Sequence, residues 1–262
     1  MQMTPEHIEQ LRRARQLLEN LSLTAKITNA IGKPIGVGIK LLPDKWSEII
    51  NDATKKSLET ALDAALMTFG KKGQLKSRDI WHKIAVVASG AGGGAFGLPA
   101  LVIELPVSTT IMLRSIADIA RSEGEDISLA ESKLACLEVF AFGGRTSKDD
   151  AAKAGYFAVR ASLAKAVSEA AEFIAEREIA KEGAPVIVRL ISKIATRFSV
   201  NVSEKAAAQA IPALGAVGGA LINLAFIDHF QDIARGHFTV RRLERICGTK
   251  IVQSEYRKLN GQ

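Results

Sequence analysis

The chain has 262 residues, of which 5% are aromatic and 24% are charged, and its formal net charge is +7. This length can bury one large hydrophobic core or two small ones, and the scarcity of aromatic and β-branched runs favours helix over sheet. Its two cysteines, Cys136 and Cys247, form no metal, redox or disulfide framework, which argues against a disulfide-rich secreted scaffold and fits a reducing cytoplasm.

The positive charge is concentrated at the two ends of the chain. Residues 1–83 carry 14 basic against 9 acidic side chains and residues 228–262 carry 7 against 4, whereas residues 114–205 carry 14 of each. Basic segments beside uncharged stretches suit an anionic lipid surface. We do not expect nucleic acid as a partner, because the sequence lacks zinc-ligand spacing, aromatic stacking signatures and dense Lys/Arg runs. The amphipathic N-terminus has no apolar signal region, so we expect no cleaved export peptide.

Helix signals begin at the N-terminus. Thr4 and Pro5 form an N-cap with proline at the first helical position, and the helix they begin extends toward Gly32. A second helix is predicted over residues 43–70, where apolar residues recur at helical spacing. A third begins near Ser77 and leads into an uncharged stretch.

This uncharged stretch, residues 84–103, is rich in glycine and alanine and reads IAVVASGAGGGAFGLPALVI. It is long enough to cross a hydrocarbon layer, which takes about 20 helical residues. Gly90 and Gly94, four residues apart, and the nearby Gly97 predict close packing of helix backbones. The run GAGGGAFG superficially matches a dinucleotide-binding turn, but no βαβ pattern or ribose-binding acid follows it. We therefore expect helix packing here and no cofactor.

The next elements are predicted from prolines, glycines and capping residues. A helix restart is flanked by Pro99 and Pro106 and continues to Gly124. Three further helices are predicted, over residues 126–143, 147–181 and 185–198. The second of these is expected to be the longest and most charged helix.

Three charged residues stand out after the first uncharged stretch. Glu104 is the one acid between residues 84 and 113, so it must face water, be protonated or meet a cation. Arg114 and Asp118 lie one turn apart and can pair with each other or with helices packed across them. We expect these charges to hold helices in register rather than to catalyse a reaction.

A second uncharged stretch, residues 206–227, reads AAAQAIPALGAVGGALINLAFI. We expect its helix to begin at Ser203 and to restart at Pro212. Gly215 and Gly219 repeat the four-residue spacing, so this backbone is predicted to pack closely against that of the first stretch. The two stretches either enter a membrane together or form the buried centre of a soluble helical domain.

A polar segment follows the second stretch. Asp228, Asp232 and Arg235 share one helix face, and His229 with Asp232 has a spacing that suits a metal. A third ligand is not evident, so we expect a solvated, salt-bridged helix and no metal. The same polar cluster continues with Arg241, Arg242 and Glu244. No Gly-x-Ser-x-Gly element or Ser-His-Asp arrangement is present, so the sequence predicts no catalytic residues.

Two long segments, GGGAFGLPALVIELPVSTTIMLRSIADIARSEGED and ALGAVGGALINLAFIDHFQDIARGHFTVRRLERICG, carry a family resemblance. They resemble the central and closing signatures of the EcsC family. The shared features are the glycine run, the acid-Leu-Pro step at residues 104–106, Leu113–Ile116, Gly215–Asn223 and Arg241–Glu244. Glu104 stands where the family often has Asp, and Cys247 stands where an aromatic residue is common.

The resemblance implies a bacterial protein of a family named after an operon partner of an ABC transporter. It therefore implies a role beside membrane transport or secretion. It supplies no reaction that can be assigned to particular residues.

We expect an all-α protein with one domain over residues 1–262, with amphipathic helices in residues 1–76 and an EcsC-like core in residues 77–262. The two glycine-rich segments are expected at its centre. The first functional hypothesis is a non-enzymatic cytoplasmic protein at the inner face of the cell membrane, bound to anionic lipid or to a membrane protein. The second is a soluble helical scaffold with a groove for a protein partner. The third is an enzyme, such as a hydrolase, that uses Glu104, Asp228 and His229 in one cleft.

Overall fold

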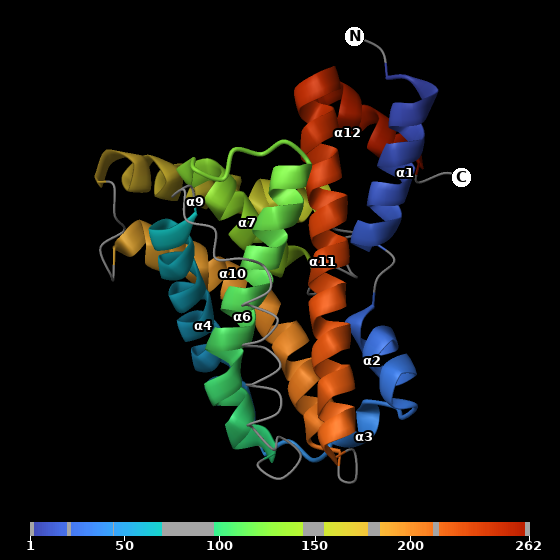
Figure 1. Cartoon of the computed structure of the whole chain (residues 1–262), viewed down its shortest axis with the longest axis vertical. Helices are drawn as coiled ribbons and strands as arrows, with labels where there is room; N and C mark the ends of the chain where they lie inside the picture. Colours follow the sequence, from blue (N-terminus) through green and yellow to red (C-terminus); the bar gives the residue numbers. More distant parts are fainter. Residues whose placement is uncertain are drawn as a thin grey trace.

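The computed structural model describes seven segments, residues 3–19, 22–43, 45–69, 97–143, 155–177, 184–211 and 215–259. All regular structure within these segments is helical, which confirms the predicted all-α class. The helices pack around one hydrophobic core (Figure 1).

The N-terminal segment forms two helices where the sequence predicted one. α1 (Pro5–Glu19) begins as predicted, because the side chain of Thr4 accepts a hydrogen bond of 3.2 Å from the backbone N–H three residues later. α2 (Leu23–Ile31) is separate because Ser22 caps its N-terminus in the same way, also at 3.2 Å. Gly32 ends α2 with a φ of 65°, in the left-handed region that glycine adopts without strain.

The short helix α3 (Gly36–Ile39) and the long helix α4 (Trp46–Thr68) follow. α4 agrees with the helix predicted over residues 43–70. The buried residues of α4 recur every three or four positions, and this face packs against α6 and α10.

α6 (Gly97–Ser122) passes through Pro106 without interruption. The restart predicted between Pro99 and Pro106 is therefore part of one continuous helix that begins two residues before Pro99. A proline inside a helix removes one backbone hydrogen bond, and the packing of α6 against α4 and α11 offsets that loss. The next helix, α7 (Ala130–Phe142), agrees with the prediction for residues 126–143, and all of its residues from Ser132 onward are buried.

α9 (Tyr156–Arg177) lies within the helix predicted over residues 147–181. α10 (Pro185–Gln209) begins at the predicted proline, but it continues past Phe198 to Gln209. The predicted helix start at Ser203 was wrong, because Ser203 lies inside α10 and its hydroxyl donates to the carbonyl of Ser199 at 2.7 Å.

α11 (Gly215–Cys247) has 33 residues and is the longest helix of the described part, whereas the longest helix was predicted over residues 147–181. The second uncharged stretch is thus divided between the end of α10 and the start of α11. The polar segment from Asp228 onward continues α11 without a break. α12 (Thr249–Lys258) follows after Gly248.

α6 and α11 lie side by side and run in the same direction (Figure 1). Both begin at the lower end of the view, where α3 and the last turn of α10 also lie. We call this region, formed by α3, the first turns of α6 and α11 and the last turn of α10, the α3 end. The described parts of both glycine-rich segments are therefore at one end of the molecule.

Phenylalanine rings from three helices meet in the core. The ring of Phe140 on α7 lies 4.8 Å from that of Phe198 on α10 and 5.2 Å from that of Phe230 on α11, centre to centre. These three side chains are fully buried, and such tilted pairs add to the stabilisation from burial. This cluster joins α7, α10 and α11.

Close backbone approaches occur at glycines that the sequence analysis did not select. A Cβ atom at Gly38 would overlap the carbonyl oxygen of Ala207, so α3 touches α10 through bare backbone. A Cβ atom at Gly236 would lie 2.8 Å from the carbonyl oxygen of Ala14, where α1 crosses α11. Helix packing through glycine therefore occurs in this fold, but at α3 and at the middle of α11.

Candidate functional site

Glu104 meets a cation, which is one of the three outcomes that the sequence allowed. Its Oε1 atom lies 2.8 Å from Nζ of Lys205, whose side chain is 1% exposed. The ammonium group also lies 4.9 Å from the ring centre of Phe226. Because these residues come from α6, α10 and α11, the ion pair ties three helices together near the α3 end. A buried charge needs such a partner, so this contact is structural.

Arg114 and Asp118 do not pair with each other. Asp118 forms an exposed ion pair with Arg121 at 2.9 Å, and Arg114 forms no ion pair with a residue of the described segments. Exposed pairs of this kind contribute about 0–1 kcal/mol. Neither residue belongs to a recognisable site.

Asp228 and His229 are neighbours in sequence but lie in different environments. Asp228 is exposed, whereas the ring of His229 is fully buried, with its Nε2 atom 3.2 Å from Nδ2 of Asn201. Burial lowers the pKa of His229 to about 4, and the charge of Lys26 acts in the same direction. Asp228 lines a surface pocket, and neither Glu104 nor His229 is among the described residues that line it.

Arginines of α11 hold the loop that joins α6 to α7. Arg241 binds Glu125 with two hydrogen bonds, Nε to Oε1 at 2.8 Å and Nη2 to Oε2 at 3.1 Å, and Arg245 binds the same carboxylate. Arg242 binds Glu123, with 2.6 Å between Nε and Oε2. Burial alone would raise the pKa of Glu125, but the hydrogen bond and charge of Arg241 hold it below its ordinary value. Arg241 and Arg242 are thus anchors of the fold.

A second polar cluster is buried between α7, α9 and α11. Glu244 pairs with Arg160 at 2.8 Å, and the hydroxyl of Tyr156 lies 2.8 Å from Nδ1 of His237. Glu138 of α7 lies in the same region, and burial raises its pKa to about 7. Of these five residues only Glu244 was predicted from the sequence, because the proximity of the other four depends on how three distant helices pack. His237 is fully buried, whereas the side chain of Arg160 is 23% exposed.

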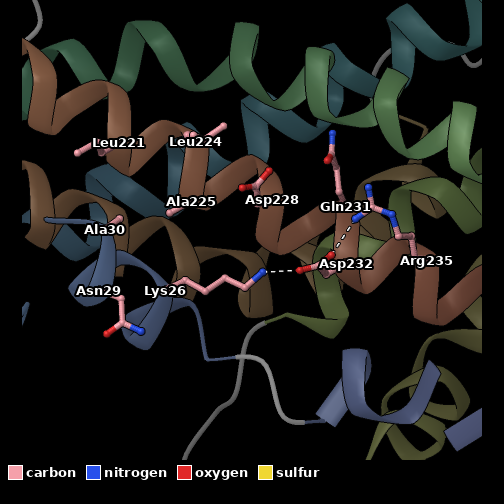
Figure 2. Close-up of a pocket in the computed structure, with 10 residues that line it drawn as sticks. All are labelled: Lys26, Asn29, Ala30, Leu221, Leu224, Ala225, Asp228, Gln231, Asp232 and Arg235. Carbon is pink, nitrogen blue, oxygen red and sulfur yellow. Dashed lines mark hydrogen bonds and ion pairs between the residues drawn. The ribbon is translucent and has the colours of Figure 1, made fainter. Parts of the chain in front are cut away.

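A pocket of about 450 Å³ lies on the surface between α2 and α11 (Figure 2). Asp232, at its centre, binds two cations: its Oδ2 atom lies 2.5 Å from Nζ of Lys26, and its Oδ1 atom lies 2.8 Å from Nη1 of Arg235. The other end of the pocket is apolar and is lined by Leu221 and Leu224. The predicted residues Asp228 and Arg235 lie here, whereas Lys26 was missed, since it is about 200 residues away in sequence.

Large apolar side chains are exposed at the α3 end. Ile39, the last residue of α3, and Leu41, which follows the helix, are 58% and 47% exposed. Leu221 and Leu224, in the first turns of α11, are 37% and 50% exposed, and Ile103 on α6 is 79% exposed. Single exposed leucines are common on protein surfaces, but several at one end indicate a binding surface.

Comparison with known proteins gives one match. The model of the EcsC protein family matches residues 6–243. The chain belongs to the EcsC family. No curated protein and no solved structure matches it. The match includes α1 from its second residue, α2, the whole first signature segment and the second signature segment as far as residue 243.

In this EcsC family protein, the described helices include none with both the length and the apolar character that a membrane span requires. The same segments contain no group of three His, Cys, Asp or Glu side chains placed to hold a metal ion.

The predicted packing between the two glycine patches stays a prediction. Gly90 and Gly94 lie outside the described residues, and Gly97 and Gly215 are the first residues of α6 and α11. A Cβ atom at Gly219 would meet no atom of the described residues within 4 Å, so Gly219 makes no close contact of the expected kind with this part of the chain. The helices α6 and α11 that these segments begin do pack against each other.

Proposed function

We propose that this EcsC family protein is non-enzymatic and binds the surface of an anionic membrane through its α3 end, in a role beside membrane transport or secretion. The observation that carries the proposal is the group of exposed apolar side chains at that end, next to exposed lysines. The proposed role beside membrane transport or secretion rests on the family to which the chain belongs.

The segment around α3 combines two attractions to a membrane. Ile39 and Leu41 are more than 40% exposed, and Lys33 and Lys40 beside them are also exposed. Each methylene group transferred into lipid contributes about 0.8 kcal/mol, and each lysine near an anionic surface about 1 kcal/mol. Neither the apolar side chains nor the lysines are sufficient alone, so we expect reversible membrane binding that needs both contributions.

The charge distribution at this end favours the same partner. Residues 206–227, which supply the end of α10 and the start of α11, contain no charged side chain. The acid of α6 in this region, Glu104, is neutralised by Lys205. Little repulsion therefore opposes the approach of the α3 end to anionic headgroups.

Vesicle sedimentation tests the proposal. We expect the protein to sediment with vesicles that contain phosphatidylglycerol and much less with pure phosphatidylcholine vesicles. The double substitution Ile39→Ser and Leu41→Ser should reduce the bound fraction several-fold, because it removes the apolar contribution. Lys33→Gln with Lys40→Gln should weaken binding to anionic vesicles alone.

A matched double variant tests whether the loss of vesicle binding is specific to the α3 end. Met67→Ser with Leu129→Ser also removes two exposed apolar side chains, 66% and 56% exposed, but away from the α3 end, and should leave binding unchanged. If both double variants lost vesicle binding equally, the assignment of the binding surface to the α3 end would be contradicted. Absence of binding to either vesicle would reject the proposal and leave the soluble scaffold as the better hypothesis.

A further inference from the structure

The pocket between α2 and α11 changes from apolar to charged along one helix. Counted from the α3 end, the residues of α11 that line it are Leu221, Leu224, Ala225, Asp228, Gln231, Asp232 and Arg235. At a rise of 1.5 Å per residue this row is about 21 Å long. The apolar part therefore lies nearest the surface that we propose to face the membrane, and the charged part lies further from it (Figure 2).

The charged part of the pocket carries a surplus of cationic hydrogen-bond donors. Asp232 is the shared partner of Lys26 and Arg235, so two positive charges face one carboxylate. An ammonium group has three N–H donors and a guanidinium five, so both retain donors beyond these bonds. Their side chains are 23% and 51% exposed, so a ligand can reach them. This arrangement suits a phosphate group.

Asp228 adds an acceptor to the same pocket. Its carboxylate is exposed, forms no ion pair with a residue of the described segments, and lies one helical turn from Asp232. A primary ammonium group can donate hydrogen bonds to such a carboxylate. The described residues that line the pocket include no aromatic side chain, which a quaternary choline group would favour.

We propose that this pocket binds a phospholipid whose headgroup contains a phosphate and a primary amine, as in phosphatidylethanolamine. The phosphate lies beside Lys26 and Arg235, the ammonium group beside Asp228, and the acyl chains along Leu224 and Leu221 toward the bilayer. This inference rests on the proposed membrane binding, since it places the lipid with its chains at the α3 end.

Short-chain lipids that are soluble as monomers test the pocket without a membrane. We would titrate the full chain by calorimetry with dihexanoyl phosphatidylethanolamine, dihexanoyl phosphatidylcholine and dihexanoyl phosphatidylglycerol below their micelle concentrations. An ion pair at an accessible site is worth up to about a five-fold change in affinity, so we expect phosphatidylethanolamine to bind about five-fold more tightly than phosphatidylcholine. Lys26→Gln should weaken binding of all three lipids.

Asp228→Asn is the decisive variant, because Asp228 is exposed and its replacement leaves the core untouched. We expect it to abolish the preference for phosphatidylethanolamine over phosphatidylcholine, whereas Asp118→Asn, a second exposed aspartate outside the pocket, should keep that preference. A preference that survives Asp228→Asn overturns the inference. So does the absence of binding by all three lipids, which would favour a partner helix as the occupant.

The two proposals fail in different measurements. If the chain sediments with vesicles through Ile39 and Leu41 but shows no headgroup preference in calorimetry, the pocket inference fails and the proposed function stands. If the chain binds no vesicle, the proposed function fails, and the orientation inferred for the lipid fails with it.

Discussion

At the scale of single residues, buried ionisable groups in this protein are held by specific partners from other helices. Lys205 has Glu104, Glu125 has Arg241, and Glu244 has Arg160. Glu138 differs from Glu104, Glu125 and Glu244. It is 4% exposed, and burial raises its pKa to about 7 although the charges of Arg160 and Arg241 favour the ionised form.

The buried carboxyl of Glu138 predicts a pH dependence of stability. Its contribution is complete below pH 4.5, the ordinary pKa, and is lost as the pH rises through about 7, because the unfolded chain ionises first. Glu138→Gln is always neutral, so we expect its stability relative to the wild type to increase by about 3 kcal/mol between pH 4.5 and pH 8. Chemical denaturation of both proteins at several pH values measures this difference.

Two buried histidines change the stability with pH in the opposite direction, but they do not obscure the effect of Glu138. Burial lowers the pKa values of His229 and His237, so their contribution is present above pH 6.5 and is lost as the pH falls. Both proteins contain them, so their effect cancels in the comparison. A stability difference that stays constant with pH would show that folding does not raise the pKa of Glu138.

At the scale of helices, the fold depends on small residues where backbones cross. α1 crosses α11 at Gly236, and α3 touches α10 at Gly38. Gly219, on the same helix as Gly236, approaches no backbone within the described segments. The four-residue spacing of small residues shows where two helices can approach, but not which of the possible sites is occupied.

Substitution by alanine is expected to have opposite effects at Gly236 and Gly219, which both lie on α11. Gly236→Ala places a methyl group 2.8 Å from the carbonyl oxygen of Ala14 and from Cγ of Leu18, so we expect a loss of about 1–3 kcal/mol in unfolding free energy. Gly219→Ala meets no atom among the described residues and should gain about 0.5–1 kcal/mol, the usual benefit of alanine inside a helix. Thermal and chemical denaturation measure both. A loss at Gly219 would mean that a helix packs there, as the sequence predicted.

At the scale of the whole molecule, burial is greatest at α7 and exposure of apolar side chains is marked at the α3 end. α7 is enclosed by neighbouring helices and is buried from Ser132 to Phe142. Ile39 and Leu41 lie at the surface of the α3 end. This arrangement separates a stable centre from a region that is free to contact a partner.

Hydrogen exchange measures that separation directly. We expect the amides of α7 to exchange most slowly, because opening them requires global unfolding. Addition of anionic vesicles should slow exchange in α3 and in the first turns of α11, and should leave α9 and α12 unchanged. Protection of α12 instead of α3 would place the membrane contact elsewhere.

Several helices could be predicted from the sequence because their signals are local. The cap at Thr4 and the apolar spacing within α4 depend on residues only a few positions apart. The break at Ser22 was missed because one serine within a periodic segment is a weak signal. The boundary between α10 and α11 was misplaced because Ser203 resembles a helix start but lies within a helix.

The sequence was sufficient for the helical class, for the EcsC family and for the three alternatives open to Glu104, since each follows from composition, from contiguous signatures or from the charge of one side chain in an apolar stretch. It also contained a clue to the cation that Glu104 meets, because Lys205 borders the second uncharged stretch as Glu104 borders the first. The pairing itself, the pocket shared by Lys26 and Asp232, and the burial of Glu138 came from the packing of helices. Contacts between residues 100 to 200 positions apart depend on how whole helices fit together, and no local pattern encodes that fit.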